Sequence, residues 1–336
     1  MKVPLQEYTN NEGNGFHPFL IWKSTIYSPN EAIPIAKDYC LQASSDIDMR
    51  VGLEFLYMNG FDQDLHQLIE KNKQSSNLLN QQWGHMYELH LARKNRSLSG
   101  QQLLKGLHHI SITSPEMNIL KNFLFIYIHY GSYQFDALSR FLDKQYELLP
   151  QVEDPLLHRL FQTRLHEVLF IYYWKRNELV LARKHAFQVL NETFSVDRQA
   201  NIHTNLALSY VLEDYGQCIM HIEESLRLAE SFGNTSIIEV NLHQNLPFIS
   251  AYHRKTDGIC SNNRAEQAHL EIAKGNKKKA IDILEKLPYQ SPFKTYYVGL
   301  AKQDKDLLKR SYHEFIEKRS DYFFSRLPLQ ALKVLG

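Results

Sequence analysis

Residues 265–287 read AEQAHLEIAKGNKKKAIDILEKL, and this stretch decides the fold. Two segments with the apolar spacing of a helix flank a tight turn at 274–276. Ala268 and Ala280 place small side chains where the two helices must approach each other closely. Helix pairs of this kind, repeated in tandem, stack into a superhelix whose groove binds extended peptides. The stretch therefore predicts a binding surface rather than an enzyme active site.

Similar helix pairs are expected upstream, and they become more regular after Pro155. The turn positions 177 and 215 lie 38 residues apart, close to the tetratricopeptide period, and the spacing then drifts. No convincing run of alternating residues predicts a strand. We therefore expect an all-α fold, a right-handed superhelix of degenerate tetratricopeptide-like helix pairs.

Capping residues predict where several helices begin. Asn30 is a suitable N-cap for the helix that follows it, and Ser114 before Pro115 is a good start signal. Pro247 is expected to bend the third of the regular pairs. The expected organisation is an N-terminal arm and entry segment (1–30), N-terminal helical repeats (31–150) and C-terminal peptide-binding repeats (151–336).

The composition argues against several classes of protein. The 336 residues carry a formal net charge of +1, whereas dedicated nucleic-acid-binding proteins usually have a basic excess. The three cysteines, Cys40, Cys218 and Cys260, form neither a disulfide framework nor a metal-binding pair, so a reducing bacterial cytoplasm is expected. No apolar run is long enough to cross a membrane, and the first residues do not resemble a signal peptide. No metal or other cofactor is predicted.

Five side chains are candidates for peptide binding. Asn205 and Asn245 lie 40 residues apart on the first helices of their pairs, and an Asn amide can both donate to and accept from a peptide backbone. Glu266 and Asp321 on an inner wall would pair with a cationic ligand side chain, and Arg198 would hold a ligand carboxylate. The ordinary alternatives are a capping Asn, a solvated acid and a surface Arg, and the sequence leaves them open.

Histidine is unusually frequent, with 16 in the chain. There is neither a zinc-binding spacing nor a specific enzyme motif, so catalytic residues are unknown. Histidines near Lys or Arg could still perform acid–base chemistry on RNA without a metal; Lys105 with His108 and Arg164 with His166 are examples. A metal-independent ribonuclease is therefore an alternative function, although surface and capping histidines explain the count more simply.

Five collinear segments resemble the arbitrium receptors (AimR) of Bacillus phages, within the broader class of Rap- and PlcR-like tetratricopeptide receptors. Each segment is short, but together they are fairly specific and cover nearly the whole chain. They are Lys37-Asp38-Tyr39-Cys40-Leu41, Pro115-Glu116-Met117-Asn118, Gln162-Thr163-Arg164 with His166, Glu266-Gln267-Ala268-His269, and Asp321 with Phe323 and Arg326-Leu327-Pro328-Leu329.

The resemblance implies an intracellular receptor for a short signalling peptide that ends in Arg-Gly-Ala. In that family, peptide binding releases the receptor from DNA and biases the phage from lysis to lysogeny. The resemblance also implies that Glu266 and Asp321 are acids that face the groove. Inner-wall polar positions of the family fall on or near Ile171 and Leu208 here, so peptide specificity or affinity is expected to differ.

Two departures from the family leave further questions open. Its members begin with a helix-turn-helix DNA-binding domain, and no such pattern fits residues 1–30, so nucleic-acid binding is uncertain. The family also continues beyond the final Leu335-Gly336 into a helix used in dimer contacts, so a monomer or a weak homodimer is expected here. A Rap-like adaptor that binds a host or phage protein is a third function. The peptide's first residues and the output target are not predicted.

Overall fold

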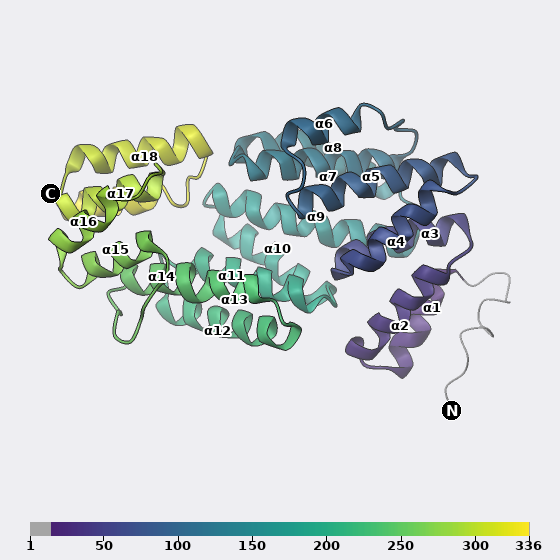
Figure 1. Ribbon diagram of the computed structural model, residues 1–336, viewed down its shortest axis with the longest axis horizontal. Coiled ribbons are helices and arrows are strands. Elements are labelled where there is room, and N and C mark those ends of the chain that lie inside the picture. The colour runs from purple at the N-terminus through teal and green to yellow at the C-terminus, as the bar shows by residue number, and fades with distance from the viewer. Residues whose placement is uncertain (1–14, 336) are drawn as a thin grey trace. The chain divides into compact units, whose positions relative to one another are not determined.

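The computed structural model describes residues 15–335, and the regular structure in that range is helical (Figure 1). No strand occurs between residues 15 and 335. The expected all-α fold of tetratricopeptide-like helix pairs is confirmed. The residues expected to form the start of an N-terminal arm, 1–14, lie outside the described residues.

The helices form two compact units, and the boundary between the units falls within α9. Unit 1 comprises the chain up to Ser132 and Ala137–Leu165, and unit 2 comprises Tyr133–Asp136 and the chain from His166 onward. Unit 1 contains α1 (Phe16–Ile26), α2 (Pro29–Gln42), α3 (Asp46–Asn59), α4 (Asp62–Lys73), α5 (Leu78–Lys94), α6 (Gly100–Leu107), α7 (Pro115–Gly131), α8 (Ser139–Leu148), the 3-10 turn η3 (Leu149–Gln151) and the first part of α9 (Pro155–Lys175). The 3-10 turn η2 (Phe135–Leu138) is shared between the units.

Unit 2 continues the pattern of paired helices from the second part of α9 to the C-terminal end. Its elements are α10 (Leu179–Glu192), α11 (Val196–Tyr210), α12 (Tyr215–Phe232), α13 (Thr235–Val240), the π turn η4 (Asn241–Asn245), α14 (Leu246–Tyr252), α15 (Arg264–Ala273), α16 (Lys277–Glu285), α17 (Pro292–Lys302), α18 (Lys305–Arg319) and α19 (Arg326–Val334).

Small residues bring neighbouring helices close together in both units. A Cβ at Gly52 would lie 3.0 Å from Leu68, so α3 packs directly on α4. Within residues 265–287, Ala268 and Ala280 are fully buried, and Gly275 makes the turn at a φ of 86°. A left-handed φ of this kind favours glycine because other residues are strained there. The prediction of two helices joined by a tight turn is confirmed for α15 and α16.

Of two predicted helix starts, the structure confirms the one at Ser114 and contradicts the one at Asn30. The side chain of Ser114 accepts a hydrogen bond from the Met117 amide, 3.3 Å away, and α7 begins at Pro115 as predicted. The prediction for Asn30 is wrong, because α2 begins at Pro29 and its N-cap is Ser28. The Glu31 carboxylate accepts the Ser28 amide in a capping box, which places the start of the helix earlier.

The third of the regular pairs is interrupted close to Pro247. Here the chain passes from α13 through the π turn η4 into α14, and Pro247 lies in the first turn of α14. A proline in a helix removes a backbone donor and disturbs the preceding turn. The interruption matters for function because the candidate residue Asn245 is the last residue of the π turn.

Candidate peptide-binding site

Arg198 lies in the first turn of α11, where the Ser195 side chain caps the helix by accepting the Arg198 amide. Its Nη1 atom donates to both carboxylate oxygens of Glu167 on α9, each at 2.6 Å. Both side chains of this ion pair are less than one fifth exposed. The positive charge that was expected to hold a ligand carboxylate is therefore already paired with an acid of the same unit.

Asn205 lies on α11 with a half-buried side chain. Its amide makes no hydrogen bond to any residue that the structure describes, so one donor group and one acceptor remain available. Asn245 is also half-buried, but its Nδ2 donates to the Oδ1 of Asn241 at 2.9 Å.

A buried polar cluster holds Asn245 close to α11, the helix that carries Asn205. The Nδ2 of the fully buried Asn241 donates to the hydroxyls of Thr204, at 3.0 Å, and Ser225, at 2.9 Å. Thr204 precedes Asn205 on α11, so the cluster fixes η4 against that helix. The structure thus brings Asn245 close to the helix that carries Asn205. The contribution of Asn241 was not recognised in the sequence, because nothing local distinguishes it from a surface Asn.

Glu266 lies in the first turn of α15 and is held by two aromatic residues. Both of its carboxylate oxygens accept the Tyr297 hydroxyl, at 3.0 and 3.1 Å. The His269 Nδ1 is 3.6 Å from Glu266, and its ring stacks on Tyr297 with centroids 4.3 Å apart. Burial raises the pKa of Tyr297 well above its ordinary value, and the charge of Glu266 adds to the shift. Tyr297 therefore stays a hydrogen-bond donor to this carboxylate.

The charge of the Glu266 carboxylate is not matched by a Lys or Arg among the described residues. Its side chain is 13% exposed, and no Lys or Arg within residues 15–335 forms an ion pair with it. His269 is almost fully buried, and its Nδ1 has no hydrogen-bond partner among the described residues. Unit 2 thus places the partly buried carboxylate of Glu266 next to a buried nitrogen, His269 Nδ1, that has no hydrogen-bond partner among the described residues.

Asp321 is 3% exposed and lies in the segment between α18 and α19. Its Oδ1 accepts the Phe324 amide at 3.0 Å, and its Oδ2 accepts the Lys175 ammonium at 2.9 Å. Asp321 does not contact Glu266, but Phe248 links their surroundings, with its ring 5.6 Å from His269 and 6.0 Å from Phe324. The sequence did not indicate that Lys175 pairs with Asp321, since 146 residues separate them.

The groups considered for acid–base catalysis do not assemble into a site. Arg164 is fully buried and donates to Glu54, whereas His166 pairs with His185 through their Nδ1 atoms, 3.0 Å apart. The His108 amide donates to the Lys105 carbonyl at 3.2 Å, but the side chains of these two residues share no hydrogen bond in the described part of the chain. Among residues 15–335 there is also no cluster of three or more His, Cys, Asp or Glu side chains that could hold a metal ion.

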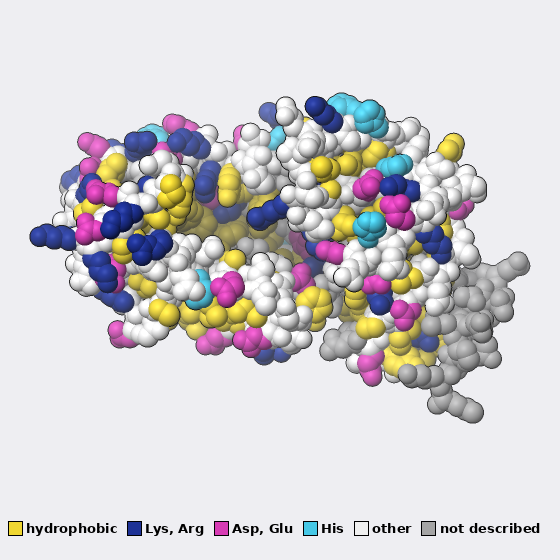
Figure 2. Space-filling view, in the orientation of Figure 1, with side chains coloured by type: hydrophobic (Ala, Val, Ile, Leu, Met, Phe, Trp, Pro, Cys, Tyr) yellow, Lys and Arg dark blue, Asp and Glu magenta, His cyan; other side chains and the backbone are white. Residues whose placement is uncertain are grey.

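The basic run of Lys277, Lys278 and Lys279 begins α16 and lies on the surface. Figure 2 shows Lys and Arg side chains over α16–α18, interspersed with acids. Lys279 pairs with Glu271 at 3.1 Å, and Lys302 of α17 pairs with Glu285 at 3.3 Å. This mixture of charges is typical of a solvated face.

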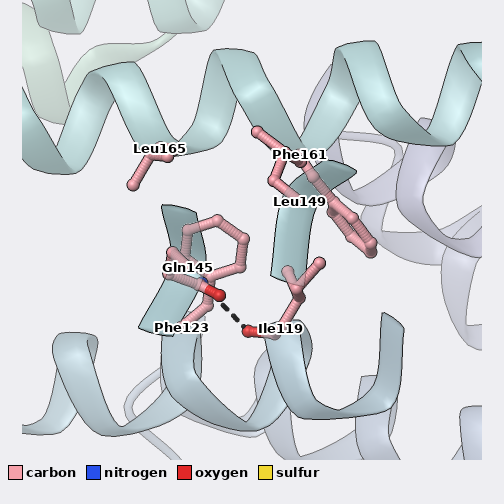
Figure 3. A pocket seen from close by; sticks show the side chains of 6 residues that line it. All are labelled: Ile119, Phe123, Gln145, Leu149, Phe161 and Leu165. Atoms are coloured by element: carbon pink, nitrogen blue, oxygen red, sulfur yellow. Dashed lines mark hydrogen bonds between the residues drawn. The ribbon is translucent and has the colours of Figure 1, made fainter. Parts of the chain in front are cut away.

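A small pocket in the core of unit 1 is lined by none of the five candidate residues (Figure 3). It has no room for a water molecule, and one polar side chain, Gln145, donates to the Ile119 carbonyl at 3.1 Å. The other lining residues are Ile119, Phe123, Leu149, Phe161 and Leu165. A space too small for a water molecule is ordinary packing of the core and cannot hold a peptide. No described helix is both long and apolar enough to cross a membrane.

Known proteins are similar to this chain over most of its length. The AimR transcriptional regulator of Bacillus phage SPbeta is 25% identical over 350 residues, which cover 99% of this chain and 89% of that protein. The AimR transcriptional regulator of Bacillus phage phi3T is 23% identical over 300 residues, which cover 85% of this chain and 77% of that protein. The solved structure described as phAimR-Ligand matches 100% of this chain and 98% of its own, with a TM-score of 0.77 at 21% identity.

A family model confirms the relationship that the short motifs indicated. The model is described as AimR transcriptional regulator-like, and it matches residues 32–334. The match covers unit 1 from residue 32, unit 2 up to residue 334, and all five candidate residues. The chain belongs to the AimR transcriptional regulator-like family.

Proposed function

We propose that the chain is an intracellular receptor for a short arbitrium-type peptide ending in Arg-Gly-Ala, and that the peptide controls whether a phage enters lysis or lysogeny. The observation that carries this proposal is the Glu266 carboxylate, which is 13% exposed and has no Lys or Arg partner in the described chain. A guanidinium placed there would gain a charge-assisted hydrogen bond in a site of reduced dielectric. Membership in a family of transcriptional regulators supports a regulatory output.

The two asparagines would bind the main chain of the peptide. The Asn205 amide has no internal hydrogen bond in the described structure, so it can donate to a peptide carbonyl and accept from a peptide amide. Asn245 keeps its Oδ1 available as an acceptor while its Nδ2 is held by Asn241. Contacts of this kind bind a backbone whatever its side chains, so the acids would have to provide the specificity.

Arg198 and Asp321 differ from Glu266 because each already has an internal partner of opposite charge. A peptide carboxylate would have to displace Glu167 from Arg198, and a peptide Arg would have to displace Lys175 from Asp321. We therefore propose that Glu266 makes the first contact with the peptide Arg, and that Arg198 and Asp321 contribute only after an exchange of partners.

Isothermal titration calorimetry with a panel of hexapeptides ending in Arg-Gly-Ala tests the proposal, with an Arg→Ala version of each peptide as the control. At least one peptide should bind with a Kd of about 1 μM or below. Glu266→Gln should weaken binding by about 1.5–3 kcal/mol, the usual loss for a hydrogen bond to a charged group. Failure of every peptide to bind the folded protein would remove the receptor proposal.

Glu271→Gln is the matched control variant. Glu271 is also on α15 and also 13% exposed, but its carboxylate pairs with Lys279. Its substitution should leave peptide affinity unchanged within about twofold, because its charge is already matched at the surface. Equal losses for the Glu266 and Glu271 variants would show that the effect of Glu266→Gln is not local.

The output of the receptor requires a separate measurement. The family description favours DNA, so phage DNA fragments should be retarded in a gel by the protein and released when peptide is added. A pull-down from host lysate with and without peptide tests the adaptor alternative. Capture of a protein that depends on peptide, without any DNA retardation, would favour the adaptor over the DNA-bound regulator.

A further inference from the structure

We propose that Lys175 is an internal occupant of a cation-binding cage in unit 2, and that a guanidinium from outside exchanges with it. The cage is formed by the Asp321 carboxylate and the rings of Trp174, Phe324 and Phe135. The inference rests on the proposed function only for the source of the guanidinium, which would be the Arg of the peptide.

The Lys175 ammonium is enclosed by one carboxylate and three aromatic faces. Its Nζ is 2.9 Å from the Oδ2 of Asp321. The same atom is 4.0 Å from the Trp174 ring centroid, 4.4 Å from that of Phe324 and 5.3 Å from that of Phe135. Aromatic walls around a single acid are the arrangement with which proteins bind large cations, because the ring faces attract charge without requiring hydrogen bonds.

The ammonium is not an ideal occupant of this cage. A Lys ammonium has three N–H donors, and in the described structure Lys175 donates only one hydrogen bond, to Asp321. Burial lowers the pKa of Lys175, and the nearby charge of Arg319 acts in the same direction. The indole N–H of Trp174 is also buried and has no acceptor among the described residues. A planar guanidinium is more weakly hydrated than an ammonium and stacks on aromatic rings, so it suits the same walls better.

The cage lies where the first and last elements of unit 2 meet. The Lys175 carbonyl accepts the amides of Tyr322, at 2.8 Å, and Phe323, at 3.3 Å. The Arg326 guanidinium donates to the Asn177 side chain at 3.0 Å. These bonds join the end of α9 to the segment between α18 and α19, across nearly the whole sequence of the unit. If a guanidinium replaced the Lys175 ammonium, the ion pair between Lys175 and Asp321 would break. The backbone hydrogen bonds from Tyr322 and Phe323 to the Lys175 carbonyl would remain.

Chemical rescue of Lys175→Ala tests the cage without any peptide. The substitution leaves space for a small cation beside Asp321, so millimolar n-propylguanidinium or n-propylammonium should raise the Tm of this variant by about 3–5 °C. The wild type, whose cage is filled, and the double variant Lys175→Ala/Asp321→Asn, which lacks the acid, should not respond. Absence of rescue in Lys175→Ala would overturn the proposal.

Peptide affinity provides the second readout. Removal of the competing ammonium should tighten binding of an Arg-containing hexapeptide to Lys175→Ala by about tenfold, since the site no longer has to be vacated. Lys175→Arg keeps the charge, so it should fold with a Tm near that of the wild type and bind the peptide several-fold more weakly. If Lys175→Ala does not fold, the Tm and the peptide affinity of Lys175→Arg test the proposal instead. A strongly destabilised Lys175→Arg with unchanged affinity would show that the cage does not accept a guanidinium.

The two proposals can fail separately. If the small cations rescue Lys175→Ala but no peptide binds the wild type, the cage stands and the receptor function falls. If peptide binds normally while rescue is absent and the Lys175 variants keep wild-type affinity, the receptor function stands and Lys175 is a purely structural residue.

Discussion

At the scale of single residues, Arg164 is held by several polar partners inside unit 1. Its guanidinium is fully buried and donates to Glu54 at 3.0 Å, to the Tyr127 hydroxyl at 2.9 Å and to the His90 Nδ1 at 2.9 Å. Burial and the neighbouring Arg164 charge hold the pKa of His90 well below its ordinary value, so a neutral imidazole accepts from Arg164. The Tyr87 hydroxyl donates to Glu54 and completes the network.

Arg164→Met should destabilise the protein by about 3–5 kcal/mol, because it leaves the Glu54 carboxylate buried without its counter-charge. Urea denaturation followed by circular dichroism would measure this loss. The double variant Glu54→Gln/Arg164→Met should recover part of it, since the unpaired charge is then removed. Arg176→Met is a matched control: its ion pair with Glu178 is nearly half exposed, and its loss should cost no more than about 1 kcal/mol. Equal losses for the Arg164 and Arg176 variants would contradict this account.

At the scale of helices, two His–His contacts join the members of successive helix pairs. His166 on α9 and His185 on α10 approach through their Nδ1 atoms at 3.0 Å, and His203 on α11 and His221 on α12 do so at 2.9 Å. Each contact needs one protonated and one bare Nδ1 nitrogen, so at least one ring of each pair must be neutral and protonation of both rings breaks the contact. Burial lowers the pKa of His185 to about 4, and that of His221 to about 4, with the partner histidine acting in the same direction.

These contacts predict a loss of stability in mild acid. The folded pKa values lie below the ordinary value of 6.5, so the stabilisation is complete above about pH 6.5 and is lost as the pH falls toward 4. The loss should be on the order of 1 kcal/mol for each pair, after a discount for partial exposure. Urea denaturation at several pH values measures it, and the variant His185→Gln/His221→Gln should show a flatter dependence. An identical pH profile for this variant would show that other groups cause the acid sensitivity.

The helices themselves were more predictable from the sequence than the contacts between them. Ser114-Pro115 and the turn at Gly275 carry their signals in a few adjacent residues, and both were found in the right place. The pairing of Lys175 with Asp321 could not be found in this way, because it depends on how the last elements of unit 2 meet the first. Asn30 failed for a different reason: Ser28 and Glu31 make a better cap than a single Asn does. The five candidate residues remain predictions, since geometry alone does not test ligand binding.

At the scale of the whole molecule, the chain has two compact units that share one continuous helix, α9. Each unit has a natural fluorescent probe in its core, since Trp83 of unit 1 is 2% exposed and Trp174 of unit 2 is 3% exposed. All five candidate peptide-binding residues belong to unit 2. A ligand that binds only the folded form of one unit stabilises that unit in proportion to its free concentration.

Peptide should therefore shift the unfolding of unit 2 more than that of unit 1. Two variants isolate the probes: Trp22→Phe/Trp83→Phe keeps Trp174, and Trp22→Phe/Trp174→Phe keeps Trp83. Because Trp174 is a wall of the proposed cage, the peptide concentration is scaled to the Kd measured for each variant. At a peptide concentration of about 100 times Kd, the Trp174 transition in urea should gain about 2.7 kcal/mol, while the Trp83 transition moves less, because proteins with more than one domain need not unfold in a single step. The Arg→Ala peptide should move neither. Coincident transitions with and without peptide would mean that α9 makes the two units unfold as one, and a shift confined to Trp83 would place the peptide outside unit 2.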